Sequence, residues 1–293
     1  GKAKRETDTI DGFLCSCWYA LRYTSPHENE RPFDPAKVKR WMPVDFYSGG
    51  AEHAVMHLLY TRFFTKAIRD MGIIDFGEPF LRLFNQGTVL SDHQKMSKSK
   101  GNVVNPDEYV ASIGADSVRA YIMFIAPWEL GGDWDDSGIA GISRWLNRVW
   151  NIVEEDYVSN SSEADNELVR MTHQTIKKVT EDFEKIRLNT MVAALMEYAN
   201  YLGKIKEAGS ASAGAWKDAI RMQLLLLAPT APHMAEELWS RRGYPYSIHN
   251  QPWPGYDESL VASDEFTLVV QVNGKVRDRL TAPVNVSGDD AKN

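Results

Sequence analysis

The sequence predicts an α/β domain that contains the C-terminal half of a doubly wound, Rossmann-like sheet, followed by an α-helical bundle and the start of a small α+β domain. A strand-like run at residues 41–48 precedes two glycines and a helix-like stretch at 51–71, which is the order of a β-α unit. Apolar residues then recur at helical spacing from 136 to 241. Finally, apolar alternation on both sides of Asn273-Gly274 is typical of a β-hairpin with a tight turn.

The composition is typical of a soluble protein of more than one domain. With 293 residues, 43% of them hydrophobic, the chain can bury a sizeable core and should divide into two or three units. The net charge of -7 argues against a uniformly basic surface, so any contact with nucleic acid must come from local patches. The sequence has neither a run of about eighteen apolar residues nor a signal-peptide core, and we therefore expect a cytoplasmic protein. Cys15 and Cys17 are too few for a disulfide framework.

The end of the first predicted strand carries residues suited to a nucleotide. Nucleotides bind at the carboxyl ends of strands in a doubly wound sheet, where Gly50 would allow a close backbone approach and Glu52 could accept hydrogen bonds from ribose hydroxyls. His53 and His57 would share one helix face, where they could hold a metal, border a small pocket or serve as structural histidines. Because neither an HExxH order nor a further ligand at metal-site spacing is present, we expect no metal site.

A short basic loop lies at residues 95–100, with the sequence Lys-Met-Ser-Lys-Ser-Lys. Three ammonium groups and two hydroxyls can hold phosphate oxygens, and lysine can neutralise charge that develops on a departing pyrophosphate. On this interpretation Lys95 and Lys98 are electrostatic stabilisers, and Ser97 helps to hold the shape of the loop. An ordinary solvated basic loop is the alternative.

The rest of the chain is predicted to be mainly helices joined by short loops, which together indicate an antiparallel bundle. Pro106 can start a helix, and Asp136 or Ser137 can cap another that continues through Ile152. The remaining helices are predicted from the apolar stripe Ile176, Val179, Phe183 and Ile186, from a segment capped by Asn189, and from residues 215–227 and 232–241, with an Ala-, Gly- and Ser-rich loop at 207–214.

Basic side chains on the predicted helices and hairpin are candidates for RNA contact. They are Arg144, Arg148, Lys177, Lys178, Lys185, Arg187, Lys275 and Arg277. The alternative for this group is an ordinary solvated face. Arg119 is expected to be structural instead of RNA-binding.

Several stretches, in the same order along the chain, resemble the leucyl-tRNA synthetase family of class I aminoacyl-tRNA synthetases. Residues 95–99 match the KMSKS signature, whose loop closes over ATP in that family. Residues 5–23 are similar to the patterns RETDT-x-D-x-F and S-x-WY-x-x-RY, and residues 47–57 to the segment that holds the adenosine ribose. Further similar stretches lie at 83–90, 116–121, 228–239 and 266–279, so that the resemblance covers nearly the whole chain.

The resemblance implies binding sites for leucine and for ATP with its Mg2+, and Lys95 and Lys98 as the catalytic lysines. The residues implied for ATP are Gly50, Glu52, Gln86, Val89, Met96, Ser97 and Lys98. Those implied for leucine are Phe13, Ser16, Tyr19, His53 and His57. The intact enzyme would join leucine to the α-phosphate of ATP and then pass it to tRNA(Leu). Cys15 and Cys17 depart from the more polar residues of the family, which leaves the preference for leucine open.

The same resemblance divides the chain into four segments: residues 1–102 with the KMSKS loop, a stem-contact region at 103–135, a tRNA-binding bundle at 136–247, and a linker with a truncated C-terminal domain at 248–293. None of the seven histidines lies in a HIGH-type string. We therefore expect a C-terminal portion that lacks the HIGH half and the editing insertion and is inactive alone. The alternatives are a non-catalytic tRNA-binding module and one subunit of a split synthetase whose N-terminal half is a separate chain.

Overall fold

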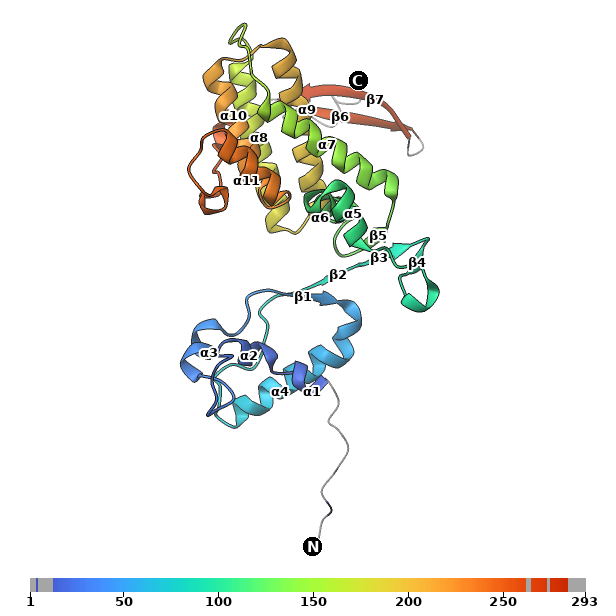
Figure 1. The fold of residues 1–293 in the computed structure, drawn as a ribbon, viewed down its shortest axis with the longest axis vertical. Helices are drawn as coiled ribbons and strands as arrows, with labels where there is room; N and C mark the ends of the chain where they lie inside the picture. Colours follow the sequence, from blue (N-terminus) through green and yellow to red (C-terminus); the bar gives the residue numbers. More distant parts are fainter. Residues whose placement is uncertain (1–3, 5–12, 262–264, 273–274, 284–293) are drawn as a thin grey trace. The chain divides into compact units, whose positions relative to one another are not determined.

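The computed structural model describes residue 4 and residues 13–261, together with the backbone of residues 265–272 and 275–283. The chain divides into two units, Gly1–Val103 with Trp128–Trp134, and Val104–Pro127 with Asp135–Asn293. Figure 1 shows their helices and strands in chain order. The first unit mixes short helices with small sheets, whereas the second consists mainly of helices and ends in a hairpin.

Parallel strand pairing organises the first unit. Strand β1 (Tyr47–Gly50) pairs in parallel with β2 (Leu83–Gln86), so that Gly50 lies opposite Gln86. The connection between the two strands contains the 3-10 turn η1 (Ala51–His53), the π-helix η2 (Ala54–Leu58) and the helix α4 (Leu59–Asp70). A helical crossover between parallel strands is the β-α-β arrangement of α/β proteins.

The predicted strand at residues 41–48 is wrong in its first half. The side chain of Asp34 accepts a hydrogen bond of 2.9 Å from a backbone N–H two residues later and caps α3 (Pro35–Trp41), which begins with a proline. Helix α3 includes Trp41, the first residue of that run, and residues 42–46 contribute only an isolated parallel bridge between Val44 and Phe80. The strand begins only at Tyr47, and the glycine pair lies inside it instead of forming a turn after it.

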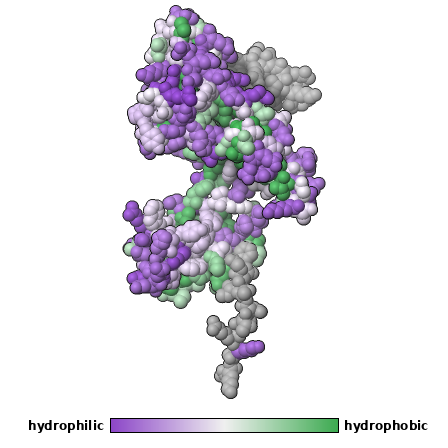
Figure 2. All heavy atoms as spheres, in the orientation of Figure 1, coloured by the Kyte–Doolittle hydropathy of each residue, from purple (hydrophilic) through white to green (hydrophobic). Residues whose placement is uncertain are grey.

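One face of η2 and α4 is apolar and exposed. The η2–α4 stripe consists of Val55, Met56, Leu59, Tyr60 and Phe63, whose exposed fractions range from 41% to 74%. Figure 2 shows several hydrophobic residues, in green, on the surface of this unit. An apolar helix face of this kind is normally covered by another element.

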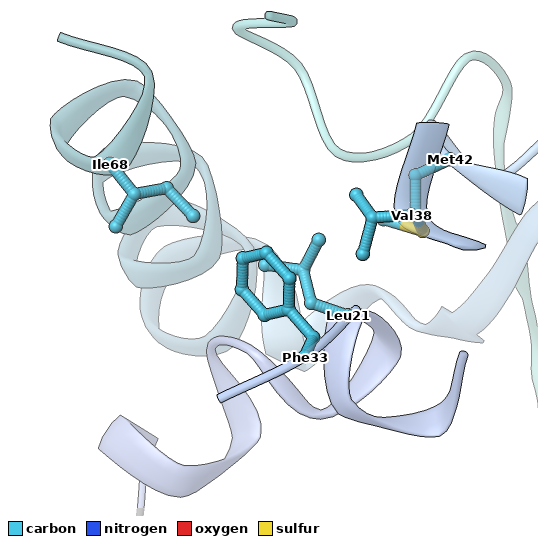
Figure 3. Packing of buried hydrophobic residues seen from close by; sticks show 5 residues of the cluster. All are labelled: Leu21, Phe33, Val38, Met42 and Ile68. Carbon is cyan, nitrogen blue, oxygen red and sulfur yellow. The ribbon is translucent and has the colours of Figure 1, made fainter. Parts of the chain in front are cut away.

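The core of the first unit lies among the short helices and the opposite face of α4. Helices α1 (Phe13–Ser16) and α2 (Tyr19–Tyr23) precede α3. Figure 3 shows the central cluster, whose members Leu21, Phe33, Val38, Met42 and Ile68 are each 3–9% exposed. Burial of each such side chain stabilises the fold by about 1.5–3 kcal/mol.

A second small sheet carries the basic loop. Strand β3 (Thr88–Ser91) pairs antiparallel with β4 (Gln94–Lys95) and parallel with β5 (Gly131–Asp133). A Cβ atom on Gly87 would lie 2.0 Å from the backbone nitrogen of Gly131, and one on Gly131 would lie 2.2 Å from the carbonyl oxygen of Thr88. Because both contacts are with backbone atoms, which cannot swing aside, only glycine fits at either position.

The second unit is built from helices whose apolar faces point inward. Its elements are α5 (Pro106–Ile113), α6 (Ala115–Phe124), α7 (Asp136–Glu154), α8 (Asp165–Glu184), α9 (Leu188–Ala208), α10 (Ala213–Leu227), α11 (Pro232–Arg241), η4 (Ile248–Asn250), α12 (Glu258–Val261), β6 (Glu265–Val272) and β7 (Lys275–Pro283). Leu168, Val179, Val192, Leu202 and Leu226 are completely buried. None of the helices in the described part of the chain is long and apolar enough to cross a membrane.

The predicted helices of this unit are present, but several ends differ. Asp135, and neither of its two successors, caps α7 by accepting a hydrogen bond of 2.9 Å from the N–H of Ser137. Asn189 lies within α9, so its predicted capping role is wrong. The loop predicted at 207–214 is shorter, because α9 continues to Ala208 and Ser212 caps α10. Strands β6 and β7 pair antiparallel on either side of residues 273–274, whose turn lies outside the described residues.

The segment that follows η4 lies along α8. The indole of Trp253 donates a hydrogen bond to Thr180 (2.8 Å) and stacks on Phe183 at 6.0 Å between ring centroids. One helical turn earlier, Lys177 forms an ion pair with Glu258 at 2.8 Å. These contacts are spaced three to four residues apart on α8, so the segment follows one face of that helix.

Asp116 of α6 joins two distant stretches of the second unit. Its carboxylate accepts hydrogen bonds from the ring of His233 (2.8 Å) and from the backbone N–H of Met234 (2.7 Å), in the first turn of α11. Three residues after Asp116, Arg119 donates to the carbonyl of Pro229 at 3.1 Å. The carboxylate thus satisfies an N–H group that helix geometry leaves unpaired, and it lies at the positive end of the helix dipole.

We expect Asp116→Ala to lower the free energy of unfolding by about 2 kcal/mol, because it leaves a helix N–H without its acceptor. Asp116→Asn keeps one acceptor oxygen and should cost clearly less. Urea unfolding followed by far-UV circular dichroism measures both. The exposed Asp218 of α10 supplies a control, since Asp218→Ala should change stability by less than about 0.5 kcal/mol. Equal effects at Asp116 and Asp218 would contradict the assigned role.

Candidate functional site

A chain of hydrogen bonds links four helical segments of the first unit, α1, α2, η2 and α4, to β1. The hydroxyl of Tyr19 donates to that of Tyr47 (2.9 Å), and the hydroxyl of Tyr47 lies 2.7 Å from Nε2 of His57. The other ring nitrogen of His57, Nδ1, lies 3.3 Å from Oγ of Ser16 and 3.4 Å from Oγ1 of Thr61. Three residues predicted to border leucine, Ser16, Tyr19 and His57, therefore lie together.

The direction of these hydrogen bonds indicates which ring nitrogen of a neutral His57 carries the proton. Because the oxygen of Tyr47 accepts from Tyr19, its own proton is available to Nε2, and the proton of a neutral His57 ring then resides on Nδ1. Burial lowers the pKa of His57, and the nearby His53 lowers it further. Burial also raises the pKa of Tyr47, so both groups are neutral near pH 7.

The remaining two residues predicted for leucine differ from these three. The ring of His53 is exposed and meets that of His57 edge-on, with 6.4 Å between the ring centroids. The backbone of Phe13 begins α1, but its side chain lies outside the described residues. Two further rings, which the sequence did not single out, belong to this group: Tyr47 stacks on Phe80 with 3.7 Å between the ring centroids.

Residues predicted to bind ATP converge at the carboxyl ends of β1 and β2. Ser48 donates to Oε1 of Gln86 (3.1 Å) across the two strands. The carboxylate of Glu52 folds back over Gly50, where a Cβ atom would lie 2.3 Å from one of its oxygens. A hydrogen bond from its own backbone amide lowers the pKa of Glu52, and the charge of Lys95 adds to this effect.

Lys95, the first lysine of the basic loop, lies close to Glu52. Nζ of Lys95 lies 3.8 Å from Oε1 of Glu52, and both side chains are exposed. Val89 lies in β3, beside Gly132 of β5. The predicted ribose acceptor and one predicted pyrophosphate stabiliser are therefore neighbours.

Asn102 closes the basic loop. Its side-chain oxygen accepts from the backbone N–H of Ser97 (2.9 Å), and its amide nitrogen donates to the carbonyl of Lys95 (3.4 Å). Within the loop, the hydroxyls of Ser97 and Ser99 are 2.8 Å apart, as expected for side chains that hold its shape. Lys98 begins the 3-10 turn η3 (Lys98–Lys100) and is exposed, whereas Met96 is half-buried.

The turn between β3 and β4 has an unusual backbone. Asp92 and His93 both have positive φ, at 51° and 58°, a conformation that among residues other than glycine is most often adopted by asparagine, aspartate and histidine. Asp133 of β5 accepts a hydrogen bond from the backbone N–H of His93 (2.9 Å) and contacts its ring. This anchor from a strand forty positions later holds the turn in place.

The predicted RNA-binding residues fall into three groups. Arg144 and Arg148 are exposed on α7, where Arg148 contacts Asn200, and Arg187 is exposed at the residue before α9. Three lysines already have acidic partners: Lys177 with Glu258 at 2.8 Å, Lys178 with Asp182 at 2.8 Å, and Lys185 with Glu181 at 3.4 Å. The positions of Lys275 and Arg277 lie on β7, but their side chains are outside the described residues.

Five contributors were not singled out from the sequence: Tyr47, Thr61, Phe80, Asn102 and Asp133. A usable signal existed for Tyr47 and Asn102, which lie two residues from the glycine pair and from the basic loop, respectively. Thr61 and Asp133 act through contacts that no local pattern reveals. Within the residues described, no cluster of three or more His, Cys, Asp or Glu side chains is arranged to hold a metal ion.

Comparison with known proteins gives matches along both units. Residues 1–131 match the family of class I tRNA synthetases (I, L, M and V), and residues 165–290 match the anticodon-binding domain of tRNA ligases. A leucine–tRNA ligase of Dehalococcoides mccartyi is 62% identical over all of this chain, and one of Deinococcus radiodurans is 50% identical over 99% of it. The chain spans 36% of the length of each of these relatives.

Solved structures agree with these matches. The agnB2 LeuRS of Agrobacterium radiobacter K84, in a ternary complex with tRNA and LeuAMS, aligns over all of this chain and 39% of its own, with a TM-score of 0.81 and 38% identity. Methionyl-tRNA synthetase of Mycobacterium tuberculosis aligns over 80% of this chain with a TM-score of 0.62 and 18% identity, which shows a shared fold. The chain therefore belongs to the leucine–tRNA ligase family of class I aminoacyl-tRNA synthetases.

Proposed function

We propose that this chain forms the part of a leucine–tRNA ligase that holds one side of ATP, part of the leucine pocket and the body of tRNA(Leu). The observation that carries the proposal is the approach of Lys95 to Glu52, 3.8 Å apart, beside the hydrogen-bonded Tyr19–Tyr47–His57 group. A fold-level likeness alone would not assign a reaction. Here, the groups needed for adenosine, phosphate and an aliphatic side chain adjoin one another within the same unit.

On this proposal the first unit contains the C-terminal half of a doubly wound catalytic sheet, and its residues act mainly by positioning leucine and ATP. Gly50, Glu52, Gln86 and Val89 would hold adenosine at the strand ends. Rings of Tyr19, Phe13, His53 and His57, with Ser16, would border the leucine side chain. Met96 and Ser97 would hold the loop against ATP, and Mg2+ would arrive bound to the phosphates.

The proposed reaction has two steps. A carboxylate oxygen of leucine attacks the α-phosphorus of ATP, and pyrophosphate leaves with the bonding electron pair. A hydroxyl of the terminal tRNA ribose then attacks the carbonyl carbon of leucyl adenylate, and AMP leaves. Lys95 and Lys98 would neutralise charge that grows on the departing pyrophosphate, which is how preorganised cations lower such barriers.

The η2–α4 stripe supports the proposal that a further polypeptide completes the first unit. Val55 and Phe63, at its two ends, are 74% and 72% exposed. Among the described strands, β1 and β2 form a parallel sheet of only two strands, although parallel sheets are normally larger and covered on both faces. A segment carrying further parallel strands and a HIGH-type motif would satisfy both features.

We expect the chain alone to leave tRNA(Leu) uncharged, because one side of ATP would lack its partner groups. Steady-state aminoacylation with purified chain, labelled leucine and ATP measures this. A complete leucine–tRNA ligase, assayed alongside, shows that the tRNA accepts leucine. Leucyl-tRNA formation by the chain well above a no-enzyme blank would refute the expectation.

In a complete leucine–tRNA ligase that contains this chain, Lys98→Ala should slow leucine-dependent pyrophosphate exchange about a hundredfold, or about 3 kcal/mol of transition-state stabilisation. Leucine affinity should barely change. Lys100 is the matched control, because it lies in the same loop but its ammonium group donates to Gln94 at 3.3 Å. Similar losses in Lys98→Ala and Lys100→Ala would show that only the total charge of the loop matters.

Binding of tRNA(Leu) should depend only moderately on salt. About five phosphate contacts, from Arg144, Arg148, Lys275, Arg277 and Arg279, predict a slope of log affinity against log salt of about minus three to minus five. Titration of labelled tRNA at several salt concentrations gives the slope. A slope near zero, or one unchanged in an Arg148→Ala, Arg277→Ala double variant, would mean that these residues form a merely solvated face.

A further inference from the structure

Thr61 is a buried polar residue of α4 that takes no direct part in the two proposed reaction steps. Its side chain is 3% exposed, and its hydroxyl lies 3.4 Å from Nδ1 of His57. The two residues are four positions apart across the junction of η2 and α4, a spacing that places both side chains on one helix face. Because a buried hydroxyl costs free energy unless it is hydrogen-bonded, this contact satisfies Thr61 as well as His57.

The thiol of Cys17 is a second partner of the Thr61 hydroxyl. Helix α1, which ends just before Cys17, packs against η2 and α4, and the Cys17 side chain is 4% exposed. Burial raises the pKa of the Cys17 thiol, and a hydrogen bond with Thr61 partly opposes this rise. A hydrogen bond that favours the thiolate is one in which the hydroxyl donates to sulfur, so Thr61 can give its own proton to Cys17.

The hydrogen bonds around His57 follow one direction from donor to acceptor. Tyr47 lies 2.7 Å from Nε2 and donates to it, so the neutral ring carries its proton on Nδ1. Through Nδ1 the ring can donate to Ser16 at 3.3 Å and to Thr61 at 3.4 Å. Thr61 then donates to Cys17. The imidazole is therefore held at both of its nitrogen atoms.

The contact with Thr61 restrains the ring of His57 more than the contact with Ser16 does. Ser16 is the last residue of the four-residue helix α1 and is half-buried, whereas Thr61 is buried in the twelve-residue helix α4. The β-branched side chain of Thr61 also has restricted rotation about χ1. Without this contact the ring could pivot about its bond to Tyr47, and the shape of the surface beside it would vary.

We propose that Thr61 is a positioning residue that holds the ring of His57 in one orientation and thereby determines which aliphatic side chain fits beside the ring. Cys17 takes the hydroxyl proton of Thr61 and so keeps the oxygen turned towards His57. This inference rests on the proposed function, because His57 borders leucine only on that proposal. A ring of fixed orientation favours leucine over isoleucine, whose methyl branch lies one carbon nearer to Cα.

The test uses a complete leucine–tRNA ligase that contains this chain, assayed by pyrophosphate exchange with leucine and with isoleucine. Thr61→Val removes the hydroxyl and keeps the branched shape. We expect the KM for leucine to rise about fivefold, the effect of one lost hydrogen bond, with kcat and the KM for ATP within about twofold of the unaltered enzyme. The ratio of kcat/KM for leucine to that for isoleucine should fall about fivefold. Thr61→Ser keeps the hydroxyl and should restore both quantities.

Thr65 supplies a matched control. It lies one turn beyond Thr61 in α4, is 2% exposed, and donates its hydroxyl to the carbonyl of Thr61 at 2.8 Å. Thr65→Val makes the same chemical change at the same depth in the same helix, two turns away from His57. It should leave the KM for leucine and the preference over isoleucine unchanged. If Thr61→Val does not fold, comparison of Thr61→Ser with Thr61→Ala isolates the same hydroxyl.

Three results would overturn the proposal. They are an unchanged KM for leucine on loss of the Thr61 hydroxyl, an equal change in Thr65→Val, and a KM for ATP that rises as much as the KM for leucine. The first excludes a role in leucine binding, and the other two indicate general damage to the fold. Absence of leucine-dependent exchange in the unaltered ligase would instead count against the proposed function.

Discussion

The close crossing of Gly87 and Gly131 is the constraint on which the arrangement of the candidate site depends. A Cβ atom at either position would come within 2.0–2.2 Å of backbone atoms, so the two chain segments can approach only as glycines. This contact sets β3 against β5, and β3 leads directly through the Asp92–His93 turn into the basic loop. This backbone contact therefore sets where the basic loop begins, and the side chains of Asp133 and Asn102 hold its preceding turn and its end.

Local patterns predicted most of the helices, because each carries its own signals. Helix α11 has the predicted bounds, with a proline in its first turn and apolar residues at helical spacing. The strand predicted at 41–48 begins too early, because its apolar residues extend back to Trp41, which belongs to α3, and over residues 42–46, where only Val44 forms a bridge. Errors at the ends of α7, α9 and α10 were of one to a few residues, since several polar residues competed for each cap.

The sequence predicted those residues of the candidate site that lie in short motifs. It did not predict contacts between residues far apart in the sequence. Glu52 and Lys95 could be assigned to neighbouring tasks from their motifs, and the structure brings them together. Asp133, by contrast, meets His93 across forty positions of sequence, and Asp116 meets His233 across 117. Such pairs are determined by the packing of whole elements, which neither hydrophobic periodicity nor residue propensity encodes.

The hydrogen bonds among Tyr19, Tyr47 and His57 have a consequence for molecular discrimination. Each polar atom in this chain of contacts already has a partner supplied by the protein itself. A side chain bearing a hydroxyl that entered beside these rings would have to compete for partners with these existing bonds, and a hydroxyl left unpaired there would cost about 1–3 kcal/mol. An aliphatic side chain would disturb none of these hydrogen bonds. Because the polar atoms of Tyr19, Tyr47 and His57 already have partners, the site disfavours a polar side chain of similar size.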